Sequence, residues 1–142
     1  NVSEYINCFA PESSGKTFTY TEEPFFYEEF NITGWTINEE QVFYQNLKQE
    51  IESLNFYFSE DYSSFEPITG VDISDSLQTQ FITYQMTVNY NNLDSSKVFT
   101  GKLRFKLFKE SSTQNWYIYY WQDQAIGDNY DACFTALKSE YL

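Results

Sequence analysis

The sequence predicts an α+β domain in which a strongly curved antiparallel sheet forms a cone packed on helices. Residues 98–108 alternate apolar and polar side chains, as a strand does when one face is covered and the other is wet. Residues 116–123, Trp-Tyr-Ile-Tyr-Tyr-Trp-Gln-Asp, form one long aromatic segment typical of a strand. Residues 43–51 carry an apolar stripe at helical spacing, and such a helix would cover one face of the sheet.

The first half of the chain predicts a helix, a strand and a second helix. Residues 2–9 are read as the end of a short helix, which Pro11 and Gly15 stop, and residues 17–21 as a short strand. Residues 22–30 are acidic, aromatic and broken by proline, so we expect an irregular surface loop. The sequence Thr-Ile-Asn-Glu at 36–39 matches a capping box, which satisfies free N–H groups where a helix starts. The stripe of the helix that follows is Phe43, Leu47 and Ile51.

The second half predicts four strands and a short terminal helix. Residues 54–59 and 81–90 alternate with period two, and residues 61–75 are a polar connection between them. Gly101 on the apolar face of the 98–108 strand is expected to mark a bulge or bend. In the aromatic strand, strict alternation would place Trp116 and Ile118 on one face and Trp121 and Asp123 on the other. The expected faces are as follows: Leu54, Phe56 and Phe58; Ile82, Tyr84, Met86, Val88 and Tyr90; Phe99, Leu103, Phe105 and Leu107, with Thr100, Lys102, Arg104 and Lys106 opposite; and, in the last helix, Cys133, Leu137 and Tyr141.

The chain of 142 residues has the length of a single domain, 1–142. Charge is unevenly distributed along it. The net charge is −13, yet five of the eight basic residues lie between Lys97 and Lys109. The negative excess repels nucleic acid and anionic membranes, so we expect neither as a partner. No run of 18 apolar residues occurs, so no membrane insertion is expected either. The chain starts at Asn1 without Met; a processed N-terminus and the scarcity of Lys favour a secreted, extracellular or periplasmic protein.

Two cysteines and two sequons are candidate modification sites. Cys8 and Cys133 lie near opposite ends, and a disulfide between them would tie the termini together. The alternative is a pair of buried thiols, because free cysteine is a common core residue. Asn1 and Asn31 begin Asn-x-Ser/Thr sequons and are candidate glycosylation sites in a cell with the machinery.

The order of these elements resembles the nuclear-transport-factor-2-like superfamily, the cone-shaped fold shared with ketosteroid isomerases and polyketide cyclases. The last strand resembles the W-x-I-x-x-W-x-D pattern of small bacterial members, here Trp116, Ile118, Trp121 and Asp123. Trp35 with Glu39 resembles the W-x-x-x-E that opens their middle helix, and residues 135–138, Thr-Ala-Leu-Lys, resemble their closing segment. Family members usually begin with a longer helical region, of which only the tail is visible here.

Catalytic motifs are scarce in the sequence. The absence of histidine excludes Ser-His-Asp and Cys-His systems and histidine-containing zinc sites, and two distant cysteines do not suit a structural zinc site. A calcium site in a secreted acidic chain stays an alternative, but no loop has the ligand spacing of an EF-hand, so we expect no metal. No glycine-rich phosphate loop is present, so we expect no cofactor. Isomerase-like members of the superfamily use carboxylates and a tyrosine inside the cone, which makes Tyr84, Trp121 and Asp123 candidate ligand-binding residues. We expect a structural role for Asp123, as partner of a buried Trp N–H or as a cap. The acid pairs are expected to be solvated: Glu22/Glu23, Glu28/Glu29, Glu39/Glu40 and Asp72/Asp75.

Two functions follow as hypotheses. The first is a non-catalytic exported interaction domain that assembles with copies of itself as a homo-oligomer or extracellular filament. Its interface would pair a basic stripe with an acidic segment: Lys102, Arg104 and Lys106 against Glu22, Glu23, Glu28 and Glu29. The alternative is a small-molecule-binding or isomerase-like domain with an apolar pocket inside the cone. A cavity of about 300 Å³ beside a buried Asp–Tyr pair would favour the second hypothesis.

Overall fold

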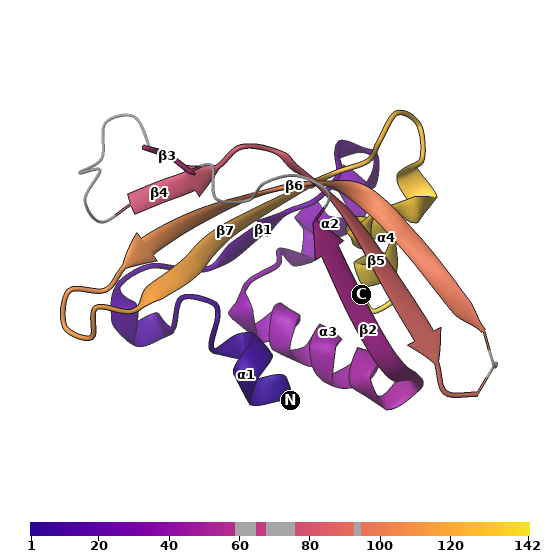
Figure 1. The fold of residues 1–142 in the computed structure, drawn as a ribbon, viewed down its shortest axis with the longest axis horizontal. Coiled ribbons are helices and arrows are strands. Elements are labelled where there is room, and N and C mark those ends of the chain that lie inside the picture. Colours follow the sequence, from indigo (N-terminus) through magenta and orange to yellow (C-terminus); the bar gives the residue numbers. More distant parts are fainter. Residues whose placement is uncertain (59–64, 68–75, 93–94) are drawn as a thin grey trace.

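The computed structural model describes residues 1–58, 65–67, 76–92 and 95–142, without the side chains of residues 32, 33 and 65–67. A curved sheet arches over helices α1, Val2–Ile6, and α3, Ile37–Glu50, while α4, Phe134–Ser139, lies inside its curve (Figure 1). The order of helices and strands confirms the α+β prediction. The predicted connection at 61–75, with Asp72 and Asp75, lies outside the described residues.

The capping box starts α3 as the sequence predicts. Thr36 and Glu39 satisfy each other's backbone N–H groups, with the Thr36 N–H donating to Glu39 Oε2 at 2.7 Å. Phe43 and Leu47 are buried, so the expected stripe is confirmed at both positions. Ile51 is also buried, but it begins the next strand, β2, Ile51–Phe58, because the helix ends at Glu50.

The acidic segment 22–30 is helical, and the loop expected there is wrong. Pro24–Phe26 forms a 3₁₀ turn, η2, and Tyr27–Thr33 forms the α-helix α2. Proline supports this start, since its fixed φ suits the first helical position, and the Glu23 carboxylate accepts from the Phe25 N–H at 3.4 Å. Phe30 is buried, so tertiary packing gives this short helix an apolar side.

Seven strands form one sheet among the described residues. Strand β6, Ser96–Lys109, is the central strand and pairs antiparallel with β7, Trp116–Gln124, along one edge. Along its other edge, the first part of β6 pairs with β5, Ile82–Tyr90, and the last part pairs with β4, Ser76–Thr79. The outer positions belong to β2 beside β5, to β3, Phe65–Pro67, beside β4, and to the parallel strand β1, Thr19–Thr21, beside β7.

The inner face of the sheet holds the predicted apolar residues. Ile82, Tyr84, Met86 and Val88 of β5 are buried, with Phe99 and Leu103 of β6 opposite. Phe105 and Leu107 are half-buried, and Lys102 on the outer face is exposed. The register that the alternation predicts is therefore confirmed.

An extra residue in β7 changes the predicted faces of the aromatic strand. Phe105 pairs with Trp121 and Lys106 with Tyr120, but Leu107 pairs with Ile118, so Tyr119 is the inserted residue of a β-bulge. Ile118 and Trp121 consequently line the same inner pocket, whereas strict alternation had placed them on opposite faces. The alternation rule cannot detect this insertion, because every residue from 116 to 121 is apolar or aromatic.

Gly101 is needed for space rather than for a bulge. The pairing of β6 with β5 continues without a shift through Gly101. A Cβ added there would lie 2.5 Å from Tyr84 Oη and 2.8 Å from the Gln124 carbonyl oxygen. Glycine thus lets the Tyr84 ring cross β6 and reach β7.

No helix in the described ranges is long and apolar enough to cross a lipid bilayer.

Candidate functional site

Asp123 is completely buried near the end of β7, where it holds the start of α4. Its Oδ2 accepts from the Thr135 N–H at 2.8 Å and from the Thr135 hydroxyl at 2.6 Å. Its Oδ1 accepts from Tyr84 Oη at 2.7 Å, and Tyr84 Oη in turn accepts from the Phe134 N–H at 2.7 Å. The carboxylate therefore caps a helix to which it is not adjacent in sequence, and the cap is the alternative that the structure selects.

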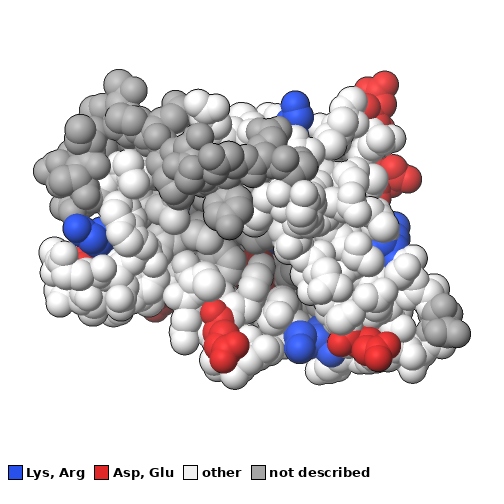
Figure 2. Space-filling view, viewed as in Figure 1, with Lys and Arg blue, Asp and Glu red and all other residues white. Residues whose placement is uncertain are grey.

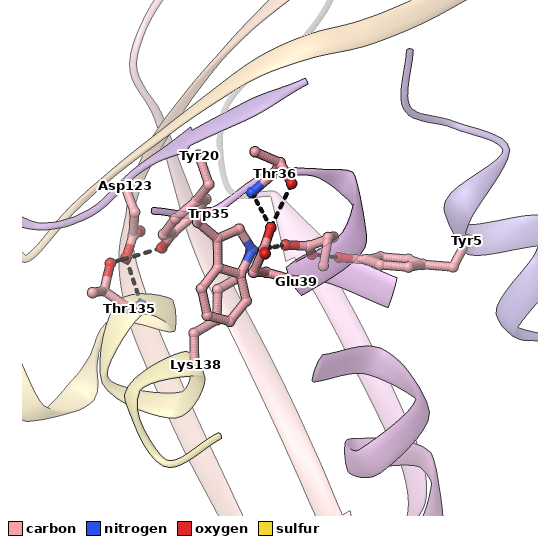
Figure 3. Close-up of polar contacts among 9 residues, drawn as sticks. Tyr5, Tyr20, Trp35, Thr36, Glu39, Asp123, Thr135 and Lys138 are labelled. Carbon is pink, nitrogen blue, oxygen red and sulfur yellow. Dashed lines mark hydrogen bonds and ion pairs between the residues drawn. The ribbon is translucent and has the colours of Figure 1, made fainter. Parts of the chain in front are cut away.

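Thr135 extends this group of hydrogen bonds to the acidic segment, as Figure 3 shows for Tyr20, Asp123 and Thr135. A hydroxyl has one proton, and here it is donated to Asp123, so Thr135 Oγ1 accepts from Tyr20 Oη at 2.7 Å and from the Glu23 N–H at 3.0 Å. The Thr135 hydroxyl therefore joins α4 to β1 and to the residue before η2.

A second buried group centres on Glu40 of α3, and the expectation that this acid is solvated is wrong. Its Oε1 accepts from Tyr5 Oη at 2.5 Å, and its Oε2 accepts from Trp35 Nε1 at 2.6 Å and from Lys138 Nζ at 2.5 Å. Glu40 and Lys138 are both completely buried and form an ion pair. The pair ties α4 to α3, and the other two donors tie α1 and the chain before α3 to the same carboxylate (Figure 3).

Aromatic rings surround the Lys138 ammonium. Nζ lies 3.7 Å from the ring centroid of Tyr20 and 4.4 Å from that of Trp121. Rings of Trp35, Phe43 and Phe134 stand within 5.4 Å. The electron-rich ring faces partly replace water around the buried cation. Burial nevertheless lowers the pKa of Lys138, while the charge of Glu40 opposes that shift.

An apolar pocket of about 300 Å³ opens beside these groups. The described residues that line the pocket carry no formal charge. Figure 2 shows the hollow near the centre of the face that is drawn there. Trp121 and Phe134 form a wall between the pocket and Lys138. The lining residues are Tyr5, Cys8, Phe9, Tyr44, Leu54, Phe56, Phe58, Phe105, Ile118, Trp121 and Phe134.

The predicted ligand-binding residues divide between the pocket and the buried polar groups. Trp121 lines the pocket, where a ligand-binding residue would have to lie. Tyr84 and Asp123 lie together, as an isomerase-like site would need, but they are not among the pocket's lining residues. Burial raises the pKa of Asp123, and the hydrogen bonds from Thr135 and Tyr84 oppose that rise. Its described partners, Tyr84 and Thr135, all donate hydrogen bonds to this carboxylate. Asp123 therefore acts as a hydrogen-bond acceptor that holds α4 to the sheet.

Trp121 does not use Asp123 as its hydrogen-bond partner. Its Nε1 is buried and has no partner among the described residues, so the first alternative for Asp123 is wrong. The Trp that does donate to a carboxylate is Trp35, and its acceptor is Glu40 rather than the Glu39 of the resemblance. Glu39 is occupied in the capping box instead.

The predicted interface residues differ in their accessibility. Lys102 is exposed, whereas Arg104 donates to the Thr79 carbonyl at 3.2 Å and Lys106 lies 4.6 Å from the Tyr120 ring centroid. Glu28 and Glu29 are exposed at the start of α2, and Glu22 is half-buried. The assignment of Glu23 to the interface is wrong, because this residue is buried and its Oε2 accepts from the Ala125 N–H at 2.6 Å.

The two cysteines are free thiols, so the disulfide alternative is not formed. Cys8 is exposed after α1, while Cys133 is buried and burial raises its pKa to about 12. The buried-thiol alternative thus holds for Cys133 alone. Asn1 and Asn31 are both exposed, and their glycosylation stays a prediction.

Sequence reasoning missed Glu40, Thr135 and Lys138 as a connected group. A signal was present for Glu40, since it shares the i, i+3, i+7 stripe with Phe43 and Leu47, which places an acid on the buried face of α3. Lys138 likewise lies at i+4 from Phe134. Neither spacing reveals that the two charges meet, because 98 positions separate them in the chain.

The buried phenols predict a loss of stability above pH 10. Burial raises the pKa of Tyr5, Tyr20 and Tyr84 well above the ordinary value, and the nearby carboxylates Glu40 and Asp123 add to the rise. Above about pH 10 the unfolded chain loses these protons while the native protein keeps them, so the free energy of unfolding falls as pH rises. Lys138 contributes the opposite slope while the unfolded lysine loses its proton around pH 10.4, because folding lowers its pKa, and three phenols outweigh this one group.

Denaturant unfolding at pH 9.5 and 11, with tyrosinate absorbance as a second probe, measures this effect. Each of the three phenols contributes up to about 1.4 kcal/mol per pH unit. The Tyr84→Phe variant has one buried phenol fewer and should show a shallower decline. A native chain equally stable at both pH values would contradict the burial of these groups.

Comparison with known proteins supports the fold and adds no activity. No protein-family model matches the sequence, and no curated protein matches it. An NTF2-like protein of unknown function in nutrient uptake from Rhodospirillum rubrum superposes with a TM-score of 0.55 at 8% identity, covering 88% of this chain and 84% of that one. An NTF2-like superfamily protein from Salmonella enterica serovar Typhimurium superposes with a TM-score of 0.51 at 10% identity, covering 78% and 72%. The chain therefore has the nuclear-transport-factor-2-like fold.

Proposed function

We propose that this domain is a non-catalytic binding protein that takes up a small apolar molecule in the pocket between α1 and β2. The observation that carries the proposal is the lining of the 300 Å³ pocket, which is aromatic and aliphatic and has no charged side chain. Burial of a ligand's apolar surface, at about 25 cal/mol per Å², is then the main source of affinity.

The arrangement of the buried acids supports binding without catalysis. A general base must reach the proton that it removes, directly or through one water. Asp123 and Glu40 are outside the pocket lining. Asp123 accepts hydrogen bonds that hold α4 to the sheet, and Glu40 accepts hydrogen bonds that hold α4 and α1 to α3. Among the described residues, no carboxylate lines the pocket to serve as the base of an isomerase-like site, and the hydroxyl of the lining residue Tyr5 is already donated to Glu40.

Filling the pocket tests the proposal. Leu54 lines the pocket from β2, and Leu54→Trp places an indole in the space where a ligand would lie. We expect calorimetric titration with N-phenyl-1-naphthylamine, an uncharged apolar probe, to show saturable binding to the native chain and at least tenfold weaker binding to Leu54→Trp. The control is Tyr57→Trp on the same strand, where the native side chain is 64% exposed. Absent binding to the native chain, or equal binding to Leu54→Trp, would refute the proposal.

Self-association is a second candidate function, and the exposure of opposite charges on separate surfaces supports it. Lys102 is exposed on the outer face of β6, while Glu28 and Glu29 are exposed on α2. A head-to-tail contact between such surfaces can close into a ring or continue as a filament, as proposed for an exported assembly domain.

Charge reversal tests this second candidate. We expect Lys102→Glu/Arg104→Glu/Lys106→Glu to abolish self-association measured by multi-angle light scattering. Adding Glu28→Lys/Glu29→Lys to the same chain should restore the oligomer, because the contact is then re-formed with its signs exchanged. An oligomer that is unaffected by the triple reversal places the contact elsewhere, and a native chain that stays monomeric excludes it.

A further inference from the structure

Tyr5 belongs both to the pocket wall and to the buried Glu40 group. Its ring lines the pocket and stacks on Tyr44 with centroids 4.0 Å apart. Its hydroxyl donates to Glu40 Oε1 at 2.5 Å. Among the described residues, this side-chain hydrogen bond joins α1 to α3. Figure 3 shows Tyr5 extending from α1 toward α3.

The attachment of the chain changes abruptly between α1 and the residues that follow. No residue of α1 is buried as a whole; Tyr5 is half-buried, with its hydroxyl directed to the buried Glu40. Immediately after it, the Ile118 N–H donates to the Cys8 carbonyl at 2.9 Å and the Ala10 N–H donates to the Ile118 carbonyl at 2.8 Å. The segment 8–10 is thereby fixed to β7, while α1 is attached by half-buried side chains and by the hydrogen bond from Tyr5 to Glu40.

The acceptor of the Tyr5 hydrogen bond is itself immobilised. Trp35 Nε1 and Lys138 Nζ both donate to the other oxygen of Glu40, at 2.6 and 2.5 Å. Glu40 therefore stays in place when Tyr5 leaves, and Tyr5 can return to the same geometry. A fixed acceptor and a lightly held helix are the two parts that a reversible latch needs.

We infer that Tyr5 is a latch that holds α1 closed against the apolar pocket, and that its release from Glu40 lets a ligand enter and leave. This inference rests on the proposed binding function and identifies Tyr5 and Glu40 as positioning residues for it. The hydrogen bond to a buried carboxylate sets how often α1 opens, whereas the Tyr5 ring contributes to the pocket wall in the closed state.

Tyr5→Phe separates the latch from the wall, because it keeps the ring and removes only the hydroxyl. We expect stopped-flow measurements with N-phenyl-1-naphthylamine to show association and dissociation rates that both rise roughly tenfold, the factor for losing one hydrogen bond to a charged group. The dissociation constant should stay within about twofold, since free and bound states lose the same bond. The matched control is Tyr141→Phe, which removes another Tyr–Glu hydrogen bond, from Tyr141 Oη to Glu50, on the surface.

Hydrogen exchange gives a readout that needs no ligand. In Tyr5→Phe, the amide protons of Tyr5 and Asn7, which donate to Asn1 and Ser3 within α1, should exchange roughly tenfold faster than in the native chain. Unchanged probe kinetics in a variant that still binds would overturn the latch and leave the pocket standing. Absence of probe binding by the native chain would overturn the proposed function, and the exchange rates would then decide on the latch alone: equal rates in both chains refute it.

Discussion

Lys138→Met is expected to lower the free energy of unfolding by about 3–5 kcal/mol, measured by urea denaturation at pH 7. Methionine keeps most of the side-chain volume inside the ring of aromatic residues but removes the ammonium. Glu40 then retains the donors Tyr5 and Trp35 without a countercharge, and a buried charge left without its partner costs about this much.

A double variant and a surface control make this prediction specific. In Glu40→Leu/Lys138→Met both charges are gone, so the loss should be smaller than in Lys138→Met. The remaining cost comes from the buried Trp35 N–H, about 1–3 kcal/mol, and from the Tyr5 hydroxyl, which both lose their acceptor. Lys48→Met removes an exposed lysine from the end of α3 and should change stability by no more than about 0.5 kcal/mol. If Lys138→Met and Lys48→Met behaved alike, Lys138 would have to be solvated.

Asp123→Asn should destabilise the protein by about 2–4 kcal/mol although the two side chains have nearly the same shape. Asp123 accepts from Tyr84 through one oxygen and from Thr135 through the other. An amide offers only one acceptor oxygen, so in either orientation its NH₂ group faces a donor. The buried position allows no water to repair the mismatch.

Thermal and urea unfolding of Asp123→Asn against Asp131→Asn measures this effect with the same change of charge. Asp131 is exposed in the 3₁₀ turn η3, Tyr130–Ala132, so its replacement should stay within about 0.5 kcal/mol of the native value. Hydrogen exchange should locate the damage of Asp123→Asn at the start of α4, because the Thr135 N–H loses its acceptor. Equal stability of the two variants would mean that Asp123 does not cap α4.

The two buried polar groups also explain why this fold holds acids in its interior without using them at the pocket. Asp123 and Glu40 fasten α4, a helix of six residues, to the sheet and to α3. A helix so short has little stability of its own and depends on tertiary contacts. Here charged hydrogen bonds supply those contacts, while the neighbouring rings of Trp121 and Phe134 face the pocket.

Local rules predicted well wherever one short-range pattern decides the outcome. The capping box at Thr36 and the alternation of β5 and β6 depend on neighbouring residues and on one buried face, and both are confirmed. The same rules failed at the β7 bulge, because an all-aromatic segment has no polar residue to mark a change of face. They also failed at α2, where Phe30 is buried by packing against Tyr20 and Trp35, which lie outside the helix.

Period-two and helical spacings of apolar residues are enough to predict a curved sheet on helices, since they specify which faces must leave water. Which charges lie inside depends instead on the tertiary structure. Glu40 and Lys138 are ordinary surface residue types, and they become buried only because segments distant in the chain bring a countercharge, hydrogen-bond donors and aromatic rings to the same place. That neutralisation is a property of three-dimensional proximity, because the cost of burying a charge depends on the groups around it and not on its neighbours in sequence.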